Sequence, residues 1–361
     1  EYEELEEIWE NIYYNNKDLT PFQSYEWNSN LIKNHIYNGN LNILLLYKND
    51  KPIIIAPLII KNKIFYNETN LLGVNTHSDY LNIIYDKDLQ FEDFNYFLQL
   101  LFNMKKFTLI NFLQVKESSI IVEYVKKSLY HFKQRKDISI KIPICQNNEE
   151  YLSILGKSTK KELKYKQNLA DRNLKNLLYK VYMNKELGES LINEMMSLYS
   201  VRRIEKNSKL NRQYSKFLED AMENAKNNFL SLCYVDEKLA AFNWGLISTT
   251  NDIYLIIVAI DSNFKKYSIG NLLIYNTLCD LMKENCSNQF KYNYYDLSRG
   301  TELYKYKLGG IEHYYYNFII SNKNYILILH ELMLKIHRKI QILKTWMRNI
   351  VKESRKFNLY N

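Results

Sequence analysis

The stretch Asp252-Ile-Tyr-Leu-Ile-Ile-Val-Ala-Ile260 runs directly into Asp261-Ser-Asn-Phe-Lys-Lys-Tyr-Ser-Ile-Gly270 and then into Asn271–Glu284. The first part is an apolar run of strand length, and the last part has the apolar spacing of a helix. Small residues at positions 268 and 270 would let the backbone approach a phosphate, which the first N–H groups and the dipole of a helix attract. The stretch therefore predicts an α/β unit with an anion site where its helix begins.

Two α/β units follow one another along the 361 residues, a length that exceeds what one hydrophobic core usually supports. β-rich apolar runs predict strands in the first unit at Leu41–Tyr47, Pro52–Ile60, Tyr80–Tyr85, Phe107–Val115 and Ser139–Ile144. In the second unit we expect helices over 158–173 and 186–204, and strands at Phe229–Val235, Leu239–Ser248, Ile253–Ile260 and Phe290–Tyr295. The polar residues 147–150 separate the units, so we expect one domain over 1–145 and another over 146–322.

The remaining residues, 323–361, predict a basic amphipathic helix. Its apolar residues recur every three or four positions, at Leu332, Ile336, Ile340, Leu343, Met347 and Ile350. From Lys335 onward it carries eight basic residues against the single acidic Glu353. Such a helix could pack on its own domain, lie on an anionic membrane surface or bind an acidic partner.

Composition narrows the class of protein. Hydrophobic residues make up 46% and charged residues 25%, as in folded globular proteins. The 32 Tyr residues accompany heavy use of Asn, Lys and Ile, a general bias that argues against a base-stacking surface for nucleic acid. The four Cys residues lack metal-ligand spacing, and the sequence contains no apolar run of membrane-spanning length. We expect no metal and no signal peptide, and a cytoplasmic protein that is either free or peripheral at the inner membrane face.

Four segments carry a resemblance to a known family. Lys265-Lys-Tyr-Ser-Ile-Gly270 resembles the pyrophosphate loop of GNAT acyltransferases, with Ser268 at the first Gly position, and is still more similar to the Tyr-Ser-Pro-Gly form of the cellulose-biosynthesis CelD type. Further segments similar to motifs of that type, in the same order, are Pro21-Phe-Gln-Ser-Tyr-Glu-Trp27, Leu72-Gly-Val-Asn-Thr-His-Ser-Asp79-Tyr80 and Tyr295-Asp296-Leu-Ser-Arg-Gly300-Thr-Glu302-Leu-Tyr304-Lys305. The resemblance implies two tandem GNAT-like domains, each with a mixed, mostly antiparallel sheet flanked by helices.

The resemblance also implies an acyl-CoA-dependent N-acyltransferase. An amine would attack the thioester directly, and N–H groups of the strand near Ile257–Ile260 would contact the oxyanion. The donor would be acetyl-CoA or a longer acyl-CoA, or the thioester of an acyl carrier protein. Its expected contacts are Val258, Ile260, Lys265, Lys266, Tyr267, Ser268, Ile269, Gly270 and Asn271.

Acyl transfer to an ammonium group needs a base, and the segments above offer several candidates. Asp296 and Glu302 follow a predicted strand, and Lys305 could face a phosphate or the oxyanion. Asp79 and His77 would reach in from the first unit, and the expected substrate contacts are Trp27, Tyr80, Arg299 and Tyr304. Each of these residues could instead be structural: the carboxylates could be loop residues, and Trp27 and Trp244 could be core residues. Arg202 and Arg203 could form a solvated helix face or contact an anionic acceptor.

Three functions remain open at this point. The first is acyl transfer to an amino sugar, a peptide amine or a lysine side chain. The second, implied by the related FemABX transferases, is aminoacyl transfer from aminoacyl-tRNA. The third is a noncatalytic binding protein with a degenerate fold. The departures from the family pattern at Ser268 and Ile269 are the features that support it.

Overall fold

The computed structural model describes residues 2–287 and 292–357, with side chains described as far as Met347 in the last helix. Runs of β-branched and aromatic residues form the strands of the first part of the chain, because such residues pack well on a pleated sheet. These strands are β1 (Asn40–Lys48), β2 (Lys51–Asn62), β3 (Asn67–Leu71), β4 (Ile84–Tyr85), β5 (Leu109–Lys116) and β6 (His131–Pro143). The helices are η1 (Tyr2–Leu5), α1 (Glu6–Asn15), η2 (Pro21–Gln23), α2 (Tyr25–Lys33), α3 (Phe91–Asn103) and α4 (Ile120–Lys127).

The second part of the chain has the same mixture of elements, and polar side chains cap several of its helices. The Asn211 side chain, for example, accepts a 2.7 Å hydrogen bond from the Tyr214 N–H in the first turn of a helix. The helices are α5 (Asn148–Ile154), α6 (Lys157–Asn173), α7 (Glu189–Glu205), α8 (Arg212–Asn224), η3 (Ser262–Tyr267), α9 (Ile269–Cys286), α10 (Leu303–Lys307) and α11 (Asn324–Phe357). The strands are β7 (Leu178–Met183), β8 (Asn228–Val235), β9 (Lys238–Ile247), β10 (Ile253–Ile260), β11 (Tyr294–Arg299) and β12 (Ile311–Ser321).

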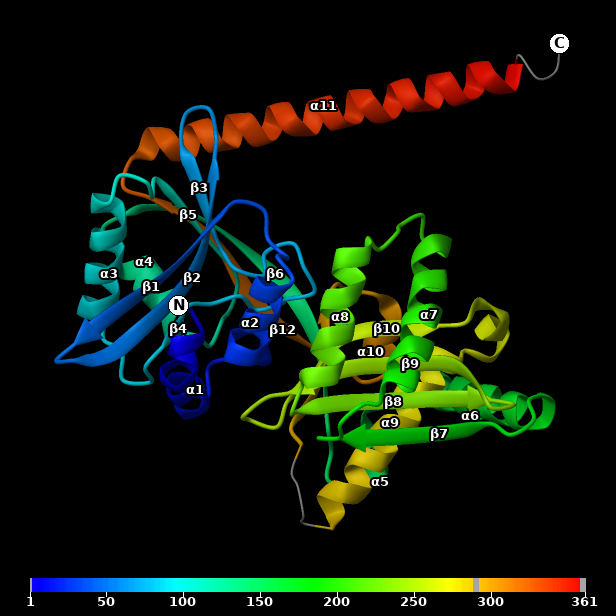
Figure 1. The fold of residues 1–361 in the computed structure, drawn as a ribbon. Coiled ribbons are helices and arrows are strands. Elements are labelled where there is room, and N and C mark those ends of the chain that lie inside the picture. Colours follow the sequence, from blue (N-terminus) through cyan, green and yellow to red (C-terminus); the bar gives the residue numbers. More distant parts are fainter. Residues whose placement is uncertain (1, 288–291, 358–361) are drawn as a thin grey trace.

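One mixed sheet of 12 strands runs through both parts (Figure 1). Its order is β1-β2-β3-β5-β12-β6-β11-β10-β9-β8-β7, with β4 paired to β2 beside this path. The pairs β3–β5 and β10–β11 are parallel, and the other pairs are antiparallel. The late strand β12 lies between β5 and β6, so it ties the end of the chain into the sheet of the first part.

Helices cover the second part of the sheet on both faces. In Figure 1, α7 and α8 lie on one face of β8–β10, and α9, α5 and α6 lie on the other. Trp27 and Leu31 of α2 share a buried cluster with Met195 of α7 and Phe217 of α8. The first part therefore packs directly on the helices of the second, which fixes the loops of one part against the strands of the other.

Within its described side chains, the last helix, α11, is anchored by its first turns alone. Ile326, Leu327 and His330 are buried, and His330 Nδ1 lies 2.9 Å from the Tyr66 hydroxyl. From Leu334 to Met347 every residue is exposed, and the helix leaves the body of the molecule in Figure 1. Among the described residues, none of the helices is both long enough and apolar enough to cross a membrane.

The predicted fold class is confirmed: mixed, mostly antiparallel strands are flanked by helices in both parts, and a long helix comes last. The predicted strand Tyr80–Tyr85 is wrong over its first four residues, because Tyr80 has a left-handed φ of 54° and only Ile84–Tyr85 pair. Residues 288–291 lie outside the described residues, and β11 begins at Tyr294 where a strand over Phe290–Tyr295 was expected. The sheet is continuous across residue 146, and the domain boundary there stays a prediction.

Candidate active site

The parallel strands β10 and β11 pair over only two positions. Within the described residues, Ile253 pairs with Tyr295 and Tyr254 with Asp296, and the ladder between these two strands ends there. On its other side β10 stays paired to β9 as far as Ile260, with a bulge between Leu255 and Ile257. Beyond Tyr254, the edge of β10 that faces β11 is therefore free to bond to an extended ligand.

This free edge borders a cleft of about 840 Å³. Residues 255–258 and Ile260 line one wall, and Leu297, Ser298 and Arg299 of β11 line another. Val258 is 40% exposed although its neighbours on the strand are largely buried, which shows that the cleft opens on the middle of β10. The separation of the two strands thus creates the cleft.

The helix α9 begins at the end of β10 and aims its first turn at the cleft. Gly270 and Asn271 line the cleft, and the first N–H groups of a helix have no partner within it. A Cβ on Gly270 would lie 2.3 Å from Ile260 Cδ1, so glycine permits the close approach of helix and strand. Ser268 has the left-handed conformation, with φ 56°, at the position where the GNAT pattern has glycine. This end of the cleft can accept an anion.

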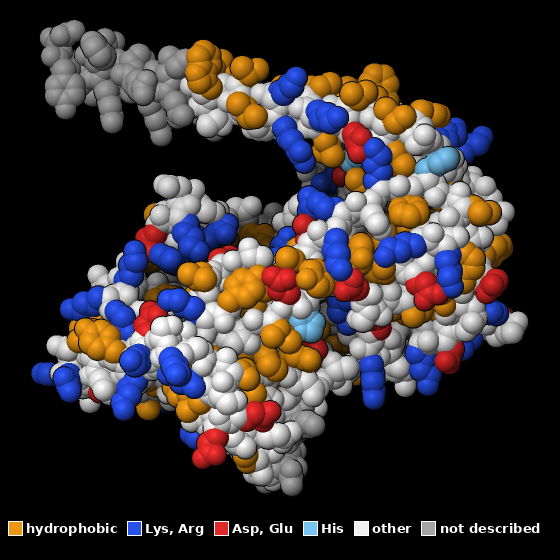
Figure 2. Space-filling view, turned by 180° about the vertical axis from the view of Figure 1, so that it is seen from behind, with side chains coloured by type: hydrophobic (Ala, Val, Ile, Leu, Met, Phe, Trp, Pro, Cys, Tyr) orange, Lys and Arg blue, Asp and Glu red, His pale blue; other side chains and the backbone are white. Residues whose placement is uncertain are grey.

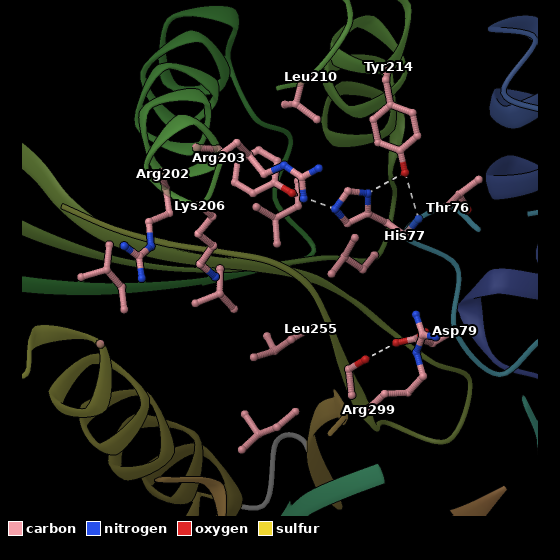
Figure 3. Close-up of a pocket in the computed structure, with 18 of the residues that line it drawn as sticks. Thr76, His77, Asp79, Arg202, Arg203, Lys206, Leu210, Tyr214, Leu255 and Arg299 are labelled. Atoms are coloured by element: carbon pink, nitrogen blue, oxygen red, sulfur yellow. Dashed lines mark hydrogen bonds and ion pairs between the residues drawn. The ribbon is translucent and has the colours of Figure 1, made fainter. Parts of the chain in front are cut away.

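Cations dominate the charge of the cleft. Five basic side chains line it, and Asp79 is the one carboxylate among the described residues that do so. The basic residues are Arg202, Arg203, Lys206, Lys209 and Arg299. Four of them come from the end of α7 and the segment after it, and Figure 3 shows Arg202, Arg203 and Lys206 above the strand. The cleft is therefore suited to a ligand with several negative charges.

His77 connects the loop after β3 to helices α7 and α8. Its Nδ1 lies 2.6 Å from the Tyr214 hydroxyl (Figure 3), and its Nε2 lies 2.9 Å from the Tyr199 hydroxyl. Burial, and then the charges of Arg203 and Arg299, lower the pKa of His77 to about 4. The imidazole is therefore neutral at pH 7, with one ring nitrogen donating and the other accepting.

Asp79 lies in the same loop and faces β11. Its carboxylate accepts a short hydrogen bond from the Ser298 hydroxyl, and its Oδ1 lies 2.6 Å from Arg299 Nε. Burial raises the pKa of Asp79, while Arg299 and Ser298 oppose the shift. A carboxylate with a raised pKa at the edge of a cleft is a candidate functional group.

Asp296 lies outside the residues that line the cleft and is 1% exposed. The Tyr80 hydroxyl donates to its Oδ1 at 2.9 Å, and Lys141 Nζ of β6 lies 3.2 Å from its Oδ2. Tyr80 is itself buried, and burial, followed by the negative charges of Asp296 and Asp79, raises its pKa well above the usual value. The structure therefore gives both residues contacts that stabilise the junction of β6, β11 and the loop after β3.

Lys305 is also buried, and it holds the turn after β11. Its Nζ donates to the Arg299 carbonyl at 2.6 Å and lies 2.9 Å from a Glu302 carboxylate oxygen. Glu302 is exposed, and although partial burial opposes the shift, the hydrogen bond from Lys305 lowers its pKa. Tyr304, between them, lines the cleft.

The cleft brings together part of the set of site residues predicted from the sequence. Those that line it are His77, Asp79, Val258, Ile260, Gly270, Asn271, Arg299 and Tyr304. Those elsewhere are Trp27, Tyr80, Lys265, Lys266, Tyr267, Ser268, Ile269, Asp296, Glu302 and Lys305. Trp27 is a core residue whose Nε1 donates to Ser78, and Tyr267 and Ile269 are also buried. In the part of the chain that the structure describes, no cluster of three His, Cys, Asp or Glu residues could hold a metal ion.

Sequence reasoning missed Tyr199, Lys206, Lys209 and Tyr214 on the α7–α8 side of the cleft. Arg203, Lys206 and Lys209 recur every third residue from the end of the predicted helix 186–204 onward, and this was the available signal. A helix end with such a run is as often a solvated surface, so the spacing alone does not assign the site.

Comparisons with known proteins agree with this geometry. Residues 157–307, from the first residue of α6 to the last residue of α10, match the family model described as acetyltransferase (GNAT) domain. The crystal structure of FemX is similar over 91% of this chain and 98% of its own, with a TM-score of 0.61 and 11% identity. A conserved protein of unknown function from Bacteroides thetaiotaomicron is similar over 88% and 97% of the two chains, with a TM-score of 0.59 and 9% identity.

No curated protein matches the chain. At 9 to 11% identity, the structural likeness shows a shared fold and nothing finer. The matched residues 157–307 include α7, β10, α9 and β11, which supply most of the residues that line the cleft.

Proposed function

We propose that this protein is an N-acyltransferase that moves an acyl group from the thioester of an acyl-CoA to a primary amine. The observation that carries the proposal is the separation of β10 and β11 after Tyr254 and Asp296, which leaves a strand edge, a helix N-terminus and a cationic wall around one cleft. The acceptor is an amino sugar, a peptide amine or a lysine side chain. The motifs around Ser268 and Lys305 favour the CelD type within the GNAT acyltransferases.

The donor would lie along the free edge of β10. Amide groups of its pantetheine arm can bond to the backbone of 257–260 in the manner of an added strand. Its pyrophosphate would meet the first N–H groups of α9 at Gly270 and Asn271, where the helix dipole favours negative charge. Arg202 and Lys206 would add charge on the opposite wall. An acyl carrier protein thioester presents the same arm and remains within the proposal.

The reaction would proceed by direct attack. Asp79 would take a proton from the acceptor ammonium, and the freed amine nitrogen would then attack the thioester carbonyl carbon. A backbone N–H of the β10 edge would bond to the oxyanion as the C–N bond forms, and the C–S bond would break with the thiolate leaving. The thiolate takes up the proton that the nitrogen loses as the amide forms, Asp79 then releases its own proton to solvent, and no covalent bond to the protein forms. Arg299 would hold the Asp79 carboxylate in place.

Calorimetric titration with acetyl-CoA and with a long-chain acyl-CoA tests the donor. Gly270→Glu would place bulk and negative charge at the α9 N-terminus and should abolish saturable binding. Gly188→Glu is the matched control, because Gly188 has open space around it on the same domain and the same charge is added. Absence of binding to the wild-type protein would contradict the proposal, and so would equal binding by the two variants.

A second candidate is aminoacyl transfer from aminoacyl-tRNA, and the likeness to FemX over nearly the whole of both chains favours it. The cationic cleft would suit that donor as well. The two candidates differ in donor, so incubation with a mixture of charged tRNAs in place of acyl-CoA separates them. Release of uncharged tRNA with formation of an amide product would support the second.

A further inference from the structure

The exposed portion of α11 has no acidic residue to balance its cations. From Leu332 to Met347 the helix carries Lys335, Arg338, Lys339 and Lys344, and no Asp or Glu. The preceding Glu331 is engaged, with its carboxylate paired to Lys133 of β6. The helix therefore presents an uncompensated positive surface where it leaves the body of the protein, as Figure 2 shows.

The same portion exposes large apolar side chains along one stripe. Its members recur every three or four positions and lie between 43% and 55% exposed: Leu332, Ile336, Ile340, Leu343 and Met347. Trp346 extends the stripe on one side and is 62% exposed. No described residue of this chain covers these side chains, although an exposed apolar stripe of this length is unfavourable in water.

We propose that α11 docks on an anionic phospholipid surface, with the apolar stripe in the boundary between headgroups and acyl chains and the flanking residues Lys335, Lys339 and Lys344 on the headgroups. An interfacial helix combines these features: an apolar face, a Trp at its edge and basic residues beside it. The stems of Lys335 and Lys339 can lie along the apolar face while their ammonium groups reach the phosphates. The acyl-transfer site would then work beside a membrane surface.

Pairing with a second copy fits the charges less well. Two α11 helices joined along the stripe would bring eight described cations together with no acidic partner between 332 and 347. An anionic surface compensates the cations that flank the stripe, Lys335, Lys339 and Lys344.

Trp346 makes the test specific. The other three Trp residues, Trp9, Trp27 and Trp244, are no more than 3% exposed, so a change in emission or in acrylamide quenching reports on α11. The full chain is mixed with vesicles of phosphatidylcholine alone or of phosphatidylcholine with phosphatidylglycerol. We expect a blue shift, reduced quenching and cosedimentation with the anionic vesicles only, all weakened by salt.

A pair of double variants separates the stripe from general charge. Ile340→Glu with Leu343→Glu breaks the stripe, whereas Gln341→Glu with Thr345→Glu adds the same charge on the opposite face of the helix. Partitioning should be at least about tenfold weaker in the first variant than in the second, because each Ile or Leu buries substantial apolar area.

Three outcomes would overturn the proposal. Equal partitioning of the two variants would show that the stripe does not bind. Unchanged Trp346 emission with anionic vesicles would show that the helix does not enter the interface. Trp346 already shielded in a sedimenting dimer without vesicles would show that a second copy covers the stripe.

Discussion

The described residues form two parallel strand pairs, β3–β5 and β10–β11, and the second pair borders the cleft. Residues Glu68, Thr69 and Asn70 of β3 pair with β5, much as Ile253 and Tyr254 of β10 pair with β11. After β10 the chain turns at once into η3 and α9, which leaves the strand edge free. After β3 it continues as a loop of residues 72–83, which runs back to contact β5.

The loop after β3 contacts β5 and also supplies residues to the cleft beside β10. The Tyr80 N–H donates to the Gln114 side chain at 3.2 Å, beyond the part of β5 that pairs with β3. Earlier residues of the same loop, His77 and Asp79, reach the cleft beside β10. The role of each parallel pair therefore depends on the segment that follows its first strand. The β10–β11 pair would hold the donor, and the loop that follows β3 of the β3–β5 pair supplies His77 and Asp79 to the same cleft.

The largest expected effect is on turnover and comes from Asp79→Asn. If Asp79 is the base, the amide cannot accept the ammonium proton, and kcat should fall roughly a hundred- to ten-thousandfold. Donor binding by calorimetry should persist, since Asp79 lies at β11 and not at the start of α9. In the wild-type protein, the rate should rise with pH through a value above the ordinary Asp pKa of 3.8. Unchanged kcat in the variant would remove Asp79 from the reaction.

Asp296→Asn is the comparison for that result, because it also replaces a carboxylate by an amide, but at a buried residue that does not line the cleft. Loss of its charge leaves the buried Lys141 with Asp252, at 3.9 Å, as its one ion-pair partner among the described residues. We expect about 3 kcal/mol off the free energy of unfolding in urea, as for a broken buried ion pair. A folded Asp296→Asn protein of wild-type stability and lost turnover would instead assign the base role to Asp296.

The contact that His77 makes between the loop after β3 and helices α7 and α8 should weaken in acid. Its pKa is lowered from 6.5 to about 4, so its contribution to stability is present above pH 6.5 and is lost as pH falls toward 4. The loss should be on the order of 3 kcal/mol across that window. In His77→Gln, the free energy of unfolding should change less between pH 7 and pH 4. Parallel curves for the two proteins would show that His77 does not report on this contact.

The smallest expected effect concerns Ser268, in the turn between β10 and α9. Ser268 has φ 56°, a left-handed conformation that costs energy for any residue with a Cβ. Ser268→Gly removes that cost but adds entropy to the unfolded chain, so it should raise the free energy of unfolding by about 0.5 to 1 kcal/mol. Ser287→Gly at the other end of α9, where φ is −77°, should instead lower it. Thermal unfolding of both proteins measures the contrast, and destabilisation by both changes would argue against strain at Ser268.

The sequence predicted the local features of the site well. The run Ile253–Ile260 and the turn before α9 form a strand and a helix start because both depend on residues that are neighbours in the chain. The choice between Asp79 and Asp296 depends on distant residues: Lys141 neutralises Asp296 from a strand more than a hundred positions earlier. Likewise, β12 joins β5 and β6 through pairings that no local pattern encodes.

Hydrogen–deuterium exchange with and without acetyl-CoA tests most directly whether the donor lies along β10. We predict slower exchange of the amides over 255–260 and 269–271 when the donor is saturating, and no change in β8 or in the Gly270→Glu protein. Protection at β10 would mean that the free strand edge is occupied, as proposed for the pantetheine arm. Saturable donor binding with no protection in either segment would contradict this placement of the donor.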